Sequence, residues 1–455
     1  MTEQTELTET RLPLTYALQL LSVMDLVHTG GARGPRFVIA LGCRLRGAVD
    51  EAALAAAIDD LVARHDGLRT VLDGQEQVIS PPTPGRFTVV DLATPDPAAR
   101  AARAEAFLDE LDAAEYPADT PPLLWVYLGR LASDDAVLGV VAHHSVTDAW
   151  SVDLLVRELA DCYAARSAGE EPRLPPAGRY ADHVAADLAA ADNPRSLAYW
   201  ERQLDGMPVL SVPADAPRPK GGRAVKAKRR FAVPAELADR LAAVGRQARC
   251  TPFITLLTGY AVLLHRLTGE TDIGVLTLNS GRGRPEVERL VGYLLNPVPL
   301  RFDLAGDPAL TECLARVRRT CLDAYRYEIP VLKLTLTVPA AAAAIAGQGA
   351  LVVPFQHLPS RERTEELPFG PGCTRQGIQR RANRQQEGAA LPLDGLWTTQ
   401  PEASGGLTGT VHYTPDVVAE ATARAQVDGY LAVLHQLAAD PGRAISQITL
   451  PGAYR

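Results

Sequence analysis

The sequence predicts a mixed α/β protein, because short apolar runs typical of strands alternate with segments whose apolar residues recur at helical spacing. In the first half, residues 36–46 and 68–72 have strand character, and residues 49–64 have the pattern of an amphipathic helix. At 455 residues the chain is long for a single hydrophobic core. Two domains of roughly 200 residues each are therefore expected.

The second half continues in the same mixed style. Residues 229–233 and 272–278 read as strands, and residues 235–249 and 253–267 read as helices. Between the halves, residues 167–178 are rich in Gly and Pro, which break regular structure, and form the best linker candidate. This linker divides the chain into residues 1–178 and 179–455.

Composition limits the class of protein. The chain is 47% apolar with a net charge of -8, which predicts a soluble, mildly acidic globular protein and argues against a nucleic-acid partner. The 6 cysteines are scattered without a CxxC pair, as expected of reduced thiols in a cytoplasmic protein. The N-terminus is acidic, and no apolar run reaches the roughly 20 residues that a membrane span needs. A cytoplasmic location without membrane contact is therefore expected.

Two adjacent histidines stand where a buried strand should end. Residues 136–142 form an unbroken apolar run of the kind that is buried on both faces of a sheet. His143 and His144 follow directly, and Asp148 lies four residues after His144.

A helix is expected immediately after this turn, with either Thr147 or Ser151 as its N-cap. Its apolar face is formed by Val152, Leu155, Val156 and Leu159. A junction between a strand and a helix is rigid on both sides, so it can hold an imidazole in a fixed orientation beside a cleft.

The pattern HHxxxDxxS of residues 143–151 resembles the active-site motif of the condensation domains of nonribosomal peptide synthesis. Three further segments are similar to motifs of that family: RHDGLRT at 64–70, YADHV at 180–184 and VGYLLNPVPLR at 291–301. Asp66 replaces the usual Glu, and Ala149 replaces the usual Gly. Matching segments follow the order of the family from about residue 12 to about residue 450.

The resemblance implies a fold of two chloramphenicol-acetyltransferase-like lobes that form a V-shaped pseudo-dimer with a central tunnel. The N-terminal lobe, residues 1–178, would carry the histidine motif. The C-terminal lobe, residues 179–455, would contribute a bridging loop near residues 279–301.

The same resemblance implies roles for individual residues. His144 would act as a base or position the nucleophile, and His143 would be structural. Asp148 could pair with His144 as in a catalytic triad, but the resemblance favours a structural anchor that pairs with an arginine of the other lobe. Arg282 is the preferred partner and Arg301 the runner-up; the alternative is that both arginines are solvated loop charges. Candidates for lining the tunnel are Ala149, Trp150, Ser151, Tyr293 and Asn296.

Other kinds of site have little support in the sequence. The histidines lack HExxH spacing and no nearby Cys or Glu completes a ligand set, so no metal is expected. The DFGWG segment of plant-type coenzyme A-dependent relatives is absent. The acyl donor is then expected on the 4′-phosphopantetheine arm of a carrier protein, with no cofactor bound by the chain itself. Two basic clusters could dock an acidic carrier, although solvated surface charge is the alternative: Lys220, Arg223, Lys226, Lys228, Arg229 and Arg230, and separately Arg375, Arg380, Arg381 and Arg384.

These features together predict a free-standing condensation enzyme, an acyltransferase of natural-product biosynthesis of the nonribosomal-peptide or enediyne type. It would transfer a carrier-bound acyl or aminoacyl group to a soluble amine or alcohol. The sequence leaves amide and ester products open. Two alternatives stay open as well: a catalytically silent module that recruits partners, and an epimerase-like relative that acts on a carrier-bound aminoacyl group.

Overall fold

The structure, a computed structural model, describes residues 9–27, 33–190, 192–217, 226–347, 350–360, 365–378, 380, 384–386 and 394–452. The chain forms two compact units. Unit 1 comprises Met1–Ala189, Ser280–Leu295 and Ser360–Arg380. Unit 2 comprises Ala190–Asn279, Asn296–Pro359 and Arg381–Arg455.

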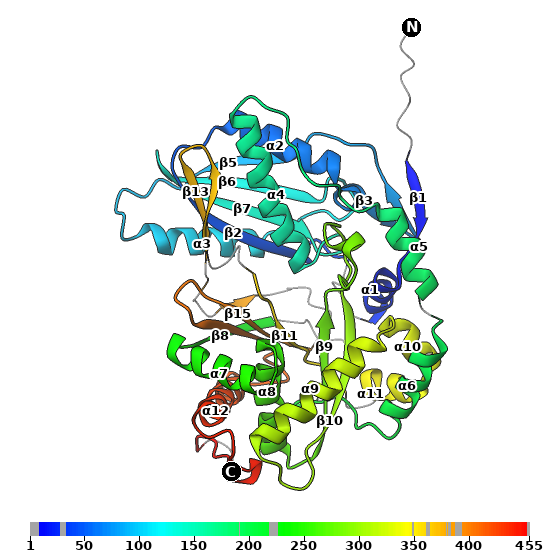
Figure 1. Ribbon diagram of the computed structural model, residues 1–455. Helices are drawn as coiled ribbons and strands as arrows, with labels where there is room; N and C mark the ends of the chain where they lie inside the picture. Colours follow the sequence, from blue (N-terminus) through cyan, green and yellow to red (C-terminus); the bar gives the residue numbers. More distant parts are fainter. Residues whose placement is uncertain are drawn as a thin grey trace. The chain divides into compact units, whose positions relative to one another are not determined.

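Unit 1 is built on a six-stranded sheet in the order β12-β13-β2-β7-β6-β5 (Figure 1). Its strands are β2 (Val38–Arg46), β5 (Arg86–Asp91), β6 (Leu124–Ala132), β7 (Asp135–His143), β12 (Glu366–Gly370) and β13 (Cys373–Gly377). A second sheet has the order β1-β4-β3, with β1 (Thr10–Pro13), β3 (Thr70–Asp73) and β4 (Glu76–Ile79). The helices are α1 (Tyr16–Val27), α2 (Glu51–Arg64), α3 (Arg100–Ala113), α4 (Ala149–Ser167) and α5 (Tyr180–Ala190), with short 3-10 turns η1 (Asp66–Arg69) and η2 (Pro285–Val287).

Strand β7 shows why the apolar run before the histidines must be a central strand. All of its residues are buried. Leu138 and Val140 pack in the cluster that includes α2 and α4, whereas Val137 and Val141 pack in the cluster that includes α3. This alternation is the two-residue period of a strand that is covered on both faces. The end of β7, where His143 lies, is therefore held firmly within the sheet.

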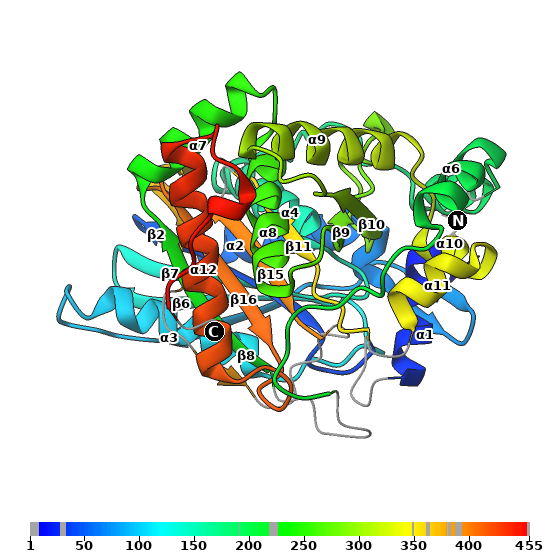
Figure 2. The same ribbon diagram turned by 90° about the horizontal axis from the view of Figure 1, so that it is seen from below.

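Unit 2 is built on a seven-stranded sheet in the order β10-β9-β11-β15-β16-β8-β14. Its strands are β8 (Lys226–Val233), β9 (Asp272–Asn279), β10 (Asn296–Asp303), β11 (Phe355–His357), β14 (Arg384–Gln386), β15 (Leu396–Pro401) and β16 (Leu407–Tyr413). Its helices are α6 (Pro194–Leu204), α7 (Ala235–Gln247), α8 (Pro252–Thr268), α9 (Leu310–Arg326), α10 (Val331–Thr337), α11 (Pro339–Ala346) and α12 (Glu420–Ala439), with the 3-10 turn η4 (Ile445–Gln447). Figure 2 shows α8 and α12 lying across the strands of this sheet.

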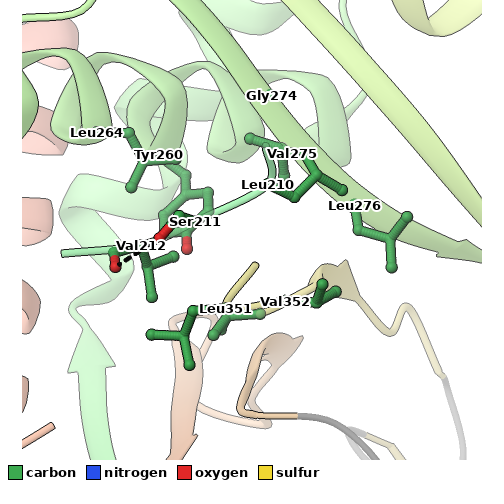
Figure 3. Close-up of a pocket in the computed structure, with 11 residues that line it drawn as sticks. Leu210, Ser211, Val212, Tyr260, Leu264, Gly274, Val275, Leu276, Leu351 and Val352 are labelled. Carbon is green, nitrogen blue, oxygen red and sulfur yellow. Dashed lines mark hydrogen bonds between the residues drawn. The ribbon is translucent and has the colours of Figure 1, made fainter. Parts of the chain in front are cut away.

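An aromatic cluster in unit 2 joins α8 and α12 to strands β11 and β15. Tyr260 stacks on Phe355 and lies beside Trp397 and Tyr430, at centroid distances of 5.2, 5.1 and 6.5 Å. A cavity of about 10 Å³ borders Tyr260 (Figure 3). This volume is about the space of one water molecule. The core of unit 2 is therefore closely packed.

The predicted mixed α/β class is confirmed, and the predicted elements are present with shifts of a few residues at their ends. Residues 68–72 are the exception. Leu68 and Arg69 belong to the turn η1, and the strand β3 starts at Thr70. The predicted N-cap was wrong: Asp148 caps α4, since its Oδ1 accepts from the Ser151 amide at 2.8 Å.

The expected linker lacks regular structure but lies inside unit 1, so the division at residue 178 differs from the observed one. Arg64 donates a hydrogen bond to the Pro175 carbonyl, which ties this stretch to α2. Tyr180 in α5 donates to Gln77 at 2.7 Å, so α5 also belongs with unit 1. The chain returns to unit 1 twice more, through residues 280–295 and 360–380.

Within the described residues, no single helix has both the length and the apolar character to cross a membrane. The pair α7 and α8 passes that test together by length and composition, but the two helices meet at 101°.

Asp135 is a buried carboxylate surrounded by three arginines. Arg44 binds both of its oxygens, Arg46 lies at 2.8 Å and Arg100 at 3.3 Å. Burial by itself would raise the pKa of Asp135, but hydrogen bonds from Arg44 and the surrounding positive charge outweigh it and lower the pKa. The ionised carboxylate therefore stabilises unit 1.

We expect Asp135→Asn to lower the free energy of unfolding by about 3 to 5 kcal/mol at neutral pH, because it leaves buried guanidinium charge uncompensated. A depressed pKa contributes stability above the unfolded value of about 3.9, and this contribution is lost as pH falls through the folded value. The difference in free energy of unfolding between wild type and variant, measured in urea melts, should thus decrease below about pH 4. Glu110→Gln, which breaks the exposed pair with Arg103, is the control and should cost about 1 kcal/mol or less. A difference in free energy of unfolding that does not change with pH would contradict this explanation.

Candidate functional site

The site forms at the turn between β7 and α4. The Thr147 hydroxyl donates to the His143 carbonyl at 2.9 Å, and the Val146 amide donates to the same carbonyl at 3.1 Å. The Asp148 carboxylate then caps α4. Each end of the turn is thus tied to a regular element, so the two histidines have a fixed backbone.

His143 uses both ring nitrogens inside the protein. Its Nε2 lies 3.0 Å from the Gly34 carbonyl, which can only accept, so Nε2 carries the proton. Its Nδ1 then accepts from the Ser145 hydroxyl at 2.7 Å. Burial lowers the pKa of His143 to about 4. These contacts leave His143 with no nitrogen for a substrate, in keeping with the structural role expected for it.

His144 is held in the tautomer that a base requires. Its Nδ1 lies 2.6 Å from the Thr147 carbonyl, so Nδ1 must carry the proton and the lone pair is on Nε2. No described residue forms a hydrogen bond with Nε2. Burial lowers the pKa of His144, although the Thr147 hydrogen bond and the Asp148 charge oppose this effect. The imidazole is therefore neutral, with one nitrogen open to accept a proton.

Two aromatic rings fix the plane of the His144 imidazole. Phe37 stacks on it at a centroid distance of 4.6 Å and an interplanar angle of 24°. Tyr293 meets it edge to face at 5.3 Å and 68°. The His144 amide also donates to the Phe37 carbonyl at 2.7 Å. These contacts restrict rotation of the ring and thereby define where Nε2 lies.

Asp148 forms its hydrogen bonds with groups other than His144. Its Oδ2 accepts from Arg282 Nη1 at 2.6 Å and from the Leu294 amide at 3.2 Å, and its Oδ1 caps α4. Both oxygens are thus engaged away from His144. Asp148 and Arg282 have side-chain exposures of 0% and 1%, so the pair is fully desolvated.

The structure brings Arg282, and not Arg301, to Asp148. Arg282 also donates to the Ser151 hydroxyl at 2.8 Å and to the Leu290 carbonyl at 3.1 Å. Arg301 lies in unit 2, where it pairs with Asp272 at 2.7 Å. By its contacts Arg282 belongs to unit 1, although its sequence position is in the second half of the chain.

Residues 280–295, here called the 280–295 loop, are attached along the length of α4. The Trp150 indole donates to the Glu288 carbonyl at 2.9 Å. The Ser151 hydroxyl donates to the Gly292 carbonyl at 3.0 Å and accepts from the Gly292 amide at 3.2 Å. Gly281 has a φ of 68°, and a Cβ there would collide with the Leu294 carbonyl, so this crossing of the loop over itself requires glycine.

A second buried carboxylate, which the sequence analysis missed, holds the loop further along α4. Glu158 has a side-chain exposure of 0% and accepts from Arg64 at 2.9 Å, His65 at 2.8 Å and Arg289 at 3.1 Å. Burial would raise the pKa of Glu158, but the His65 and Arg64 contacts lower it. The Arg64-His65 pair in the family-like segment was the available signal, but it gave no indication of the partner.

Part of the 280–295 loop borders a cavity. A cavity of about 500 Å³ lies between residues 176–183 and 284–289 of unit 1. His183, in the segment that resembles a family motif, lines this cavity, and burial lowers its pKa to about 4. The loop is held by its contacts with α4 and by a buried apolar cluster in which Leu290 and Leu294 pack with Tyr180 and Val184 of α5.

The candidates for lining a tunnel have different environments. Trp150 is 43% exposed, whereas the Ser151 side chain is buried and fully used in hydrogen bonds. Tyr293 contacts His144. Asn296 lies in unit 2, where its amide donates to Glu328 at 2.8 Å and its carbonyl accepts from the Val331 amide at 2.8 Å. Ala149 is the first residue of α4.

The basic clusters proposed for carrier docking are partly internal. Lys226 is buried and donates to the Thr414 hydroxyl at 2.8 Å. Arg375 is buried and donates to the Pro368 carbonyl at 2.6 Å, and Arg380 pairs with Asp112 at 3.2 Å. Lys220, Arg223 and Arg381, with the side chain of Arg384, lie outside the described residues.

We expect Asp148→Asn to lower the free energy of unfolding by about 3 to 5 kcal/mol, because Arg282 would stay buried without its counter-charge. Thermal and urea melts give the measurement. Asp272→Asn, which breaks the partly exposed pair with Arg301, is the matched control and should cost about 1 kcal/mol or less. Unchanged stability combined with lost activity would instead indicate that Asp148 acts on His144 directly.

The chain is similar to several multi-domain synthetases. It is 32% identical over 471 residues to one of the subunits of linear gramicidin synthase from Brevibacillus parabrevis, and the match covers 97% of this chain and 8% of that protein. It is 35% identical over 332 residues to phosphinothricin tripeptide synthetase PhsC of Streptomyces viridochromogenes, with 71% of this chain and 30% of that protein covered. The chain thus spans less than a third of the length of either relative.

Solved structures point the same way. The SgcC5 protein from Streptomyces globisporus superposes with a TM-score of 0.87 at 34% identity, over 95% of this chain and 100% of that one. The X-domain from teicoplanin biosynthesis gives a TM-score of 0.74 at 25% identity, over 99% of each chain. The first condensation domain of the CDA synthetase shares the fold, with a TM-score of 0.80 at 21% identity, over 97% of this chain and 99% of that one. The condensation domain family matches residues 32–454, and the resemblance seen in the sequence is confirmed: the chain belongs to the condensation domain family.

Proposed function

We propose that the chain transfers an acyl or aminoacyl group from the phosphopantetheine thioester of a carrier protein to a small alcohol or amine. The observation that carries this proposal is the state of His144: a half-buried imidazole, neutral at pH 7, whose Nδ1–H is bonded to the Thr147 carbonyl and whose Nε2 is unpaired among the described residues. A fixed lone pair of this kind can accept a proton from an attacking nucleophile.

The proposed reaction proceeds by addition to the thioester carbonyl and collapse of the tetrahedral centre. The nucleophile adds to the thioester carbonyl carbon, the carbonyl electron pair moves onto oxygen, and His144 Nε2 takes the proton. Collapse of the tetrahedral centre re-forms the carbonyl, breaks the carbon–sulfur bond and returns the proton to the departing thiolate. His144 is thus both base and acid within one turnover, as a neutral imidazole permits.

The proposed donor follows from the family and from the relatives. Condensation domains generally form amide bonds and work with carrier domains, and the relatives named above are peptide synthetases. We propose that the carrier supplies the phosphopantetheine arm. The chain's own contribution would be to hold His144 and to shape the site around the thioester.

The proposed acceptor rests on the SgcC5 structure, which is a complex with (R)-(-)-1-(2-naphthyl)-1,2-ethanediol and sucrose. A vicinal diol on an aromatic ring is a small alcohol, and its use as acceptor would make the product an ester. We therefore propose an aryl vicinal diol as the acceptor class and its amino-alcohol analogue as the alternative.

A second candidate function is partner recruitment without chemistry. It is favoured by the likeness to the teicoplanin X-domain, which has been solved in complex with OxyB. Retention of His144 in a base-competent tautomer favours the enzyme, since a docking module has no need of it. An epimerase-like activity would differ in one respect, because it would proceed with a carrier-bound donor and no acceptor.

We expect His144→Ala to reduce transfer at least 10²-fold while the protein stays folded. The loss should be larger with a diol acceptor than with the matching amino alcohol, because an alcohol must lose its proton as it attacks and an amine can lose it later. Single-turnover assays with both acceptors give the comparison. His265→Ala, which removes an imidazole bonded to the Glu270 carbonyl in unit 2, is the control. Equal turnover by wild type and His144→Ala would refute the proposed role of His144.

We expect a carrier-bound donor to have a kcat/KM at least about 10²-fold above that of the same acyl group on free pantetheine, because binding energy from the carrier contributes to reaction at the thioester. Steady-state assays with the two donors and one acceptor measure the ratio. Comparable values for the two donors would argue against a carrier requirement.

A further inference from the structure

Tyr293 lies beside His144 and is held there by hydrogen bonds to its two neighbours in the sequence. Its neighbours in the sequence are both anchored: Gly292 exchanges two hydrogen bonds with the Ser151 hydroxyl, and the Leu294 amide donates to Asp148 at 3.2 Å. The Tyr293 ring then meets the His144 ring edge to face at 5.3 Å. The backbone is therefore fixed on both sides of Tyr293, and this sets the position of its ring beside His144.

The ring of Tyr293 packs against His144, but its hydroxyl has no hydrogen-bond partner among the described residues that would account for it. No described residue forms a hydrogen bond with it, although the residue is only 9% exposed. Other buried tyrosines of unit 1 use their hydroxyls in the structure: Tyr116 donates to the Leu111 carbonyl at 2.9 Å, and Tyr180 donates to Gln77 at 2.7 Å. A phenol that has no partner among the described residues retains one donor for another molecule.

The electrostatic surroundings keep this hydroxyl protonated. Burial raises the pKa of Tyr293 well above its ordinary value, and the negative charge of Asp148 adds to the effect. At pH 7 the phenol is therefore a neutral donor and the His144 imidazole is unprotonated. It would not compete with His144 as a base.

We propose that Tyr293 is a catalytic residue whose hydroxyl donates a hydrogen bond to the oxyanion of the tetrahedral intermediate. The inference rests on the proposed acyl transfer. When the nucleophile adds to the thioester carbonyl, the oxygen takes the electron pair and His144 Nε2 takes the proton. The Tyr293 O–H bond stays intact, and the hydrogen bond strengthens as negative charge develops on the oxygen.

The sequence at the start of α4 provides a reason for such a donor. The family usually has glycine after the motif aspartate, and this chain has Ala149 there. A methyl group restricts how closely the backbone can approach the reacting carbonyl. A side-chain donor from the 280–295 loop would supply stabilisation that backbone amides at this turn provide less well.

The test compares wild type, Tyr293→Phe and Tyr116→Phe. Tyr293→Phe keeps the aromatic ring against His144 and removes only the hydroxyl. Two stable pantetheine derivatives serve as probes: S-pantetheinyl methylphosphonothioate, whose charged tetrahedral centre imitates the oxyanion, and a ketone in which a CH₂ group replaces the thioester sulfur. Calorimetry measures binding of each probe, and transfer assays with the carrier-bound donor measure kcat and KM.

We expect Tyr293→Phe to lower kcat by about 10²-fold with little change in KM, as for loss of one oxyanion donor. Its affinity for the phosphonothioate should fall by a similar factor, and its affinity for the ketone should be unchanged. Tyr116→Phe should lower the melting temperature without altering the ratio of the two affinities.

Two results would overturn this role for Tyr293. One is equal affinity of wild type and Tyr293→Phe for the phosphonothioate, and the other is no preference of wild type for the phosphonothioate over the ketone. Absence of transfer by wild type from any carrier-bound donor would refute the proposed function instead. The binding measurements still decide the role of the hydroxyl in that case, so the two failures are distinguishable.

Discussion

The buried ion pair between Asp148 and Arg282 is the interaction on which the site depends. Asp148 begins α4 through its Oδ1 and receives the 280–295 loop through its Oδ2, so one carboxylate joins two segments that are distant in sequence. A desolvated pair of this kind contributes little net stability compared with an apolar replacement, but it is costly to break. Its effect is therefore to select one arrangement of helix and loop.

The same helix holds the loop again at Glu158. Asp148, the N-cap of α4, and Glu158 are ten residues apart, which corresponds to about 15 Å along the helix axis. Arg282 binds the first carboxylate and Arg289 the second. These two contacts, the Ser151 hydrogen bonds and the packing of Leu290 and Leu294 against α5 hold the loop that places Tyr293 beside His144.

Local patterns in the sequence predicted the parts of this site that local physics controls. The apolar run before His143 predicted a buried strand, and the spacing of Val152 and Leu155 predicted α4, because burial period and helix period are properties of a few consecutive residues. The pairing of Arg282 with Asp148 was predicted from the family resemblance.

The Glu158 cluster and the placement of residues 280–295 and 360–380 in unit 1 were not predicted, since contacts between distant segments leave no local period. The N-cap was assigned to hydroxyl residues because both Thr147 and Ser151 fit the pattern, whereas the side chain that caps is Asp148.

The tautomer of His144 follows from this arrangement and links it to chemistry. A carbonyl can only accept, so the Thr147 carbonyl forces the proton onto Nδ1, and Thr147 is placed by a turn whose far end is Asp148. If Asp148 instead bonded His144, the imidazole would turn toward the carboxylate, and Phe37 and Tyr293 would no longer fit its faces. In the proposed reaction, Asp148 would therefore contribute by leaving the His144 ring to the Thr147 carbonyl. Burial lowers the pKa of His144 and raises the pKa of Tyr293; the negative charge of Asp148 opposes the first shift and adds to the second.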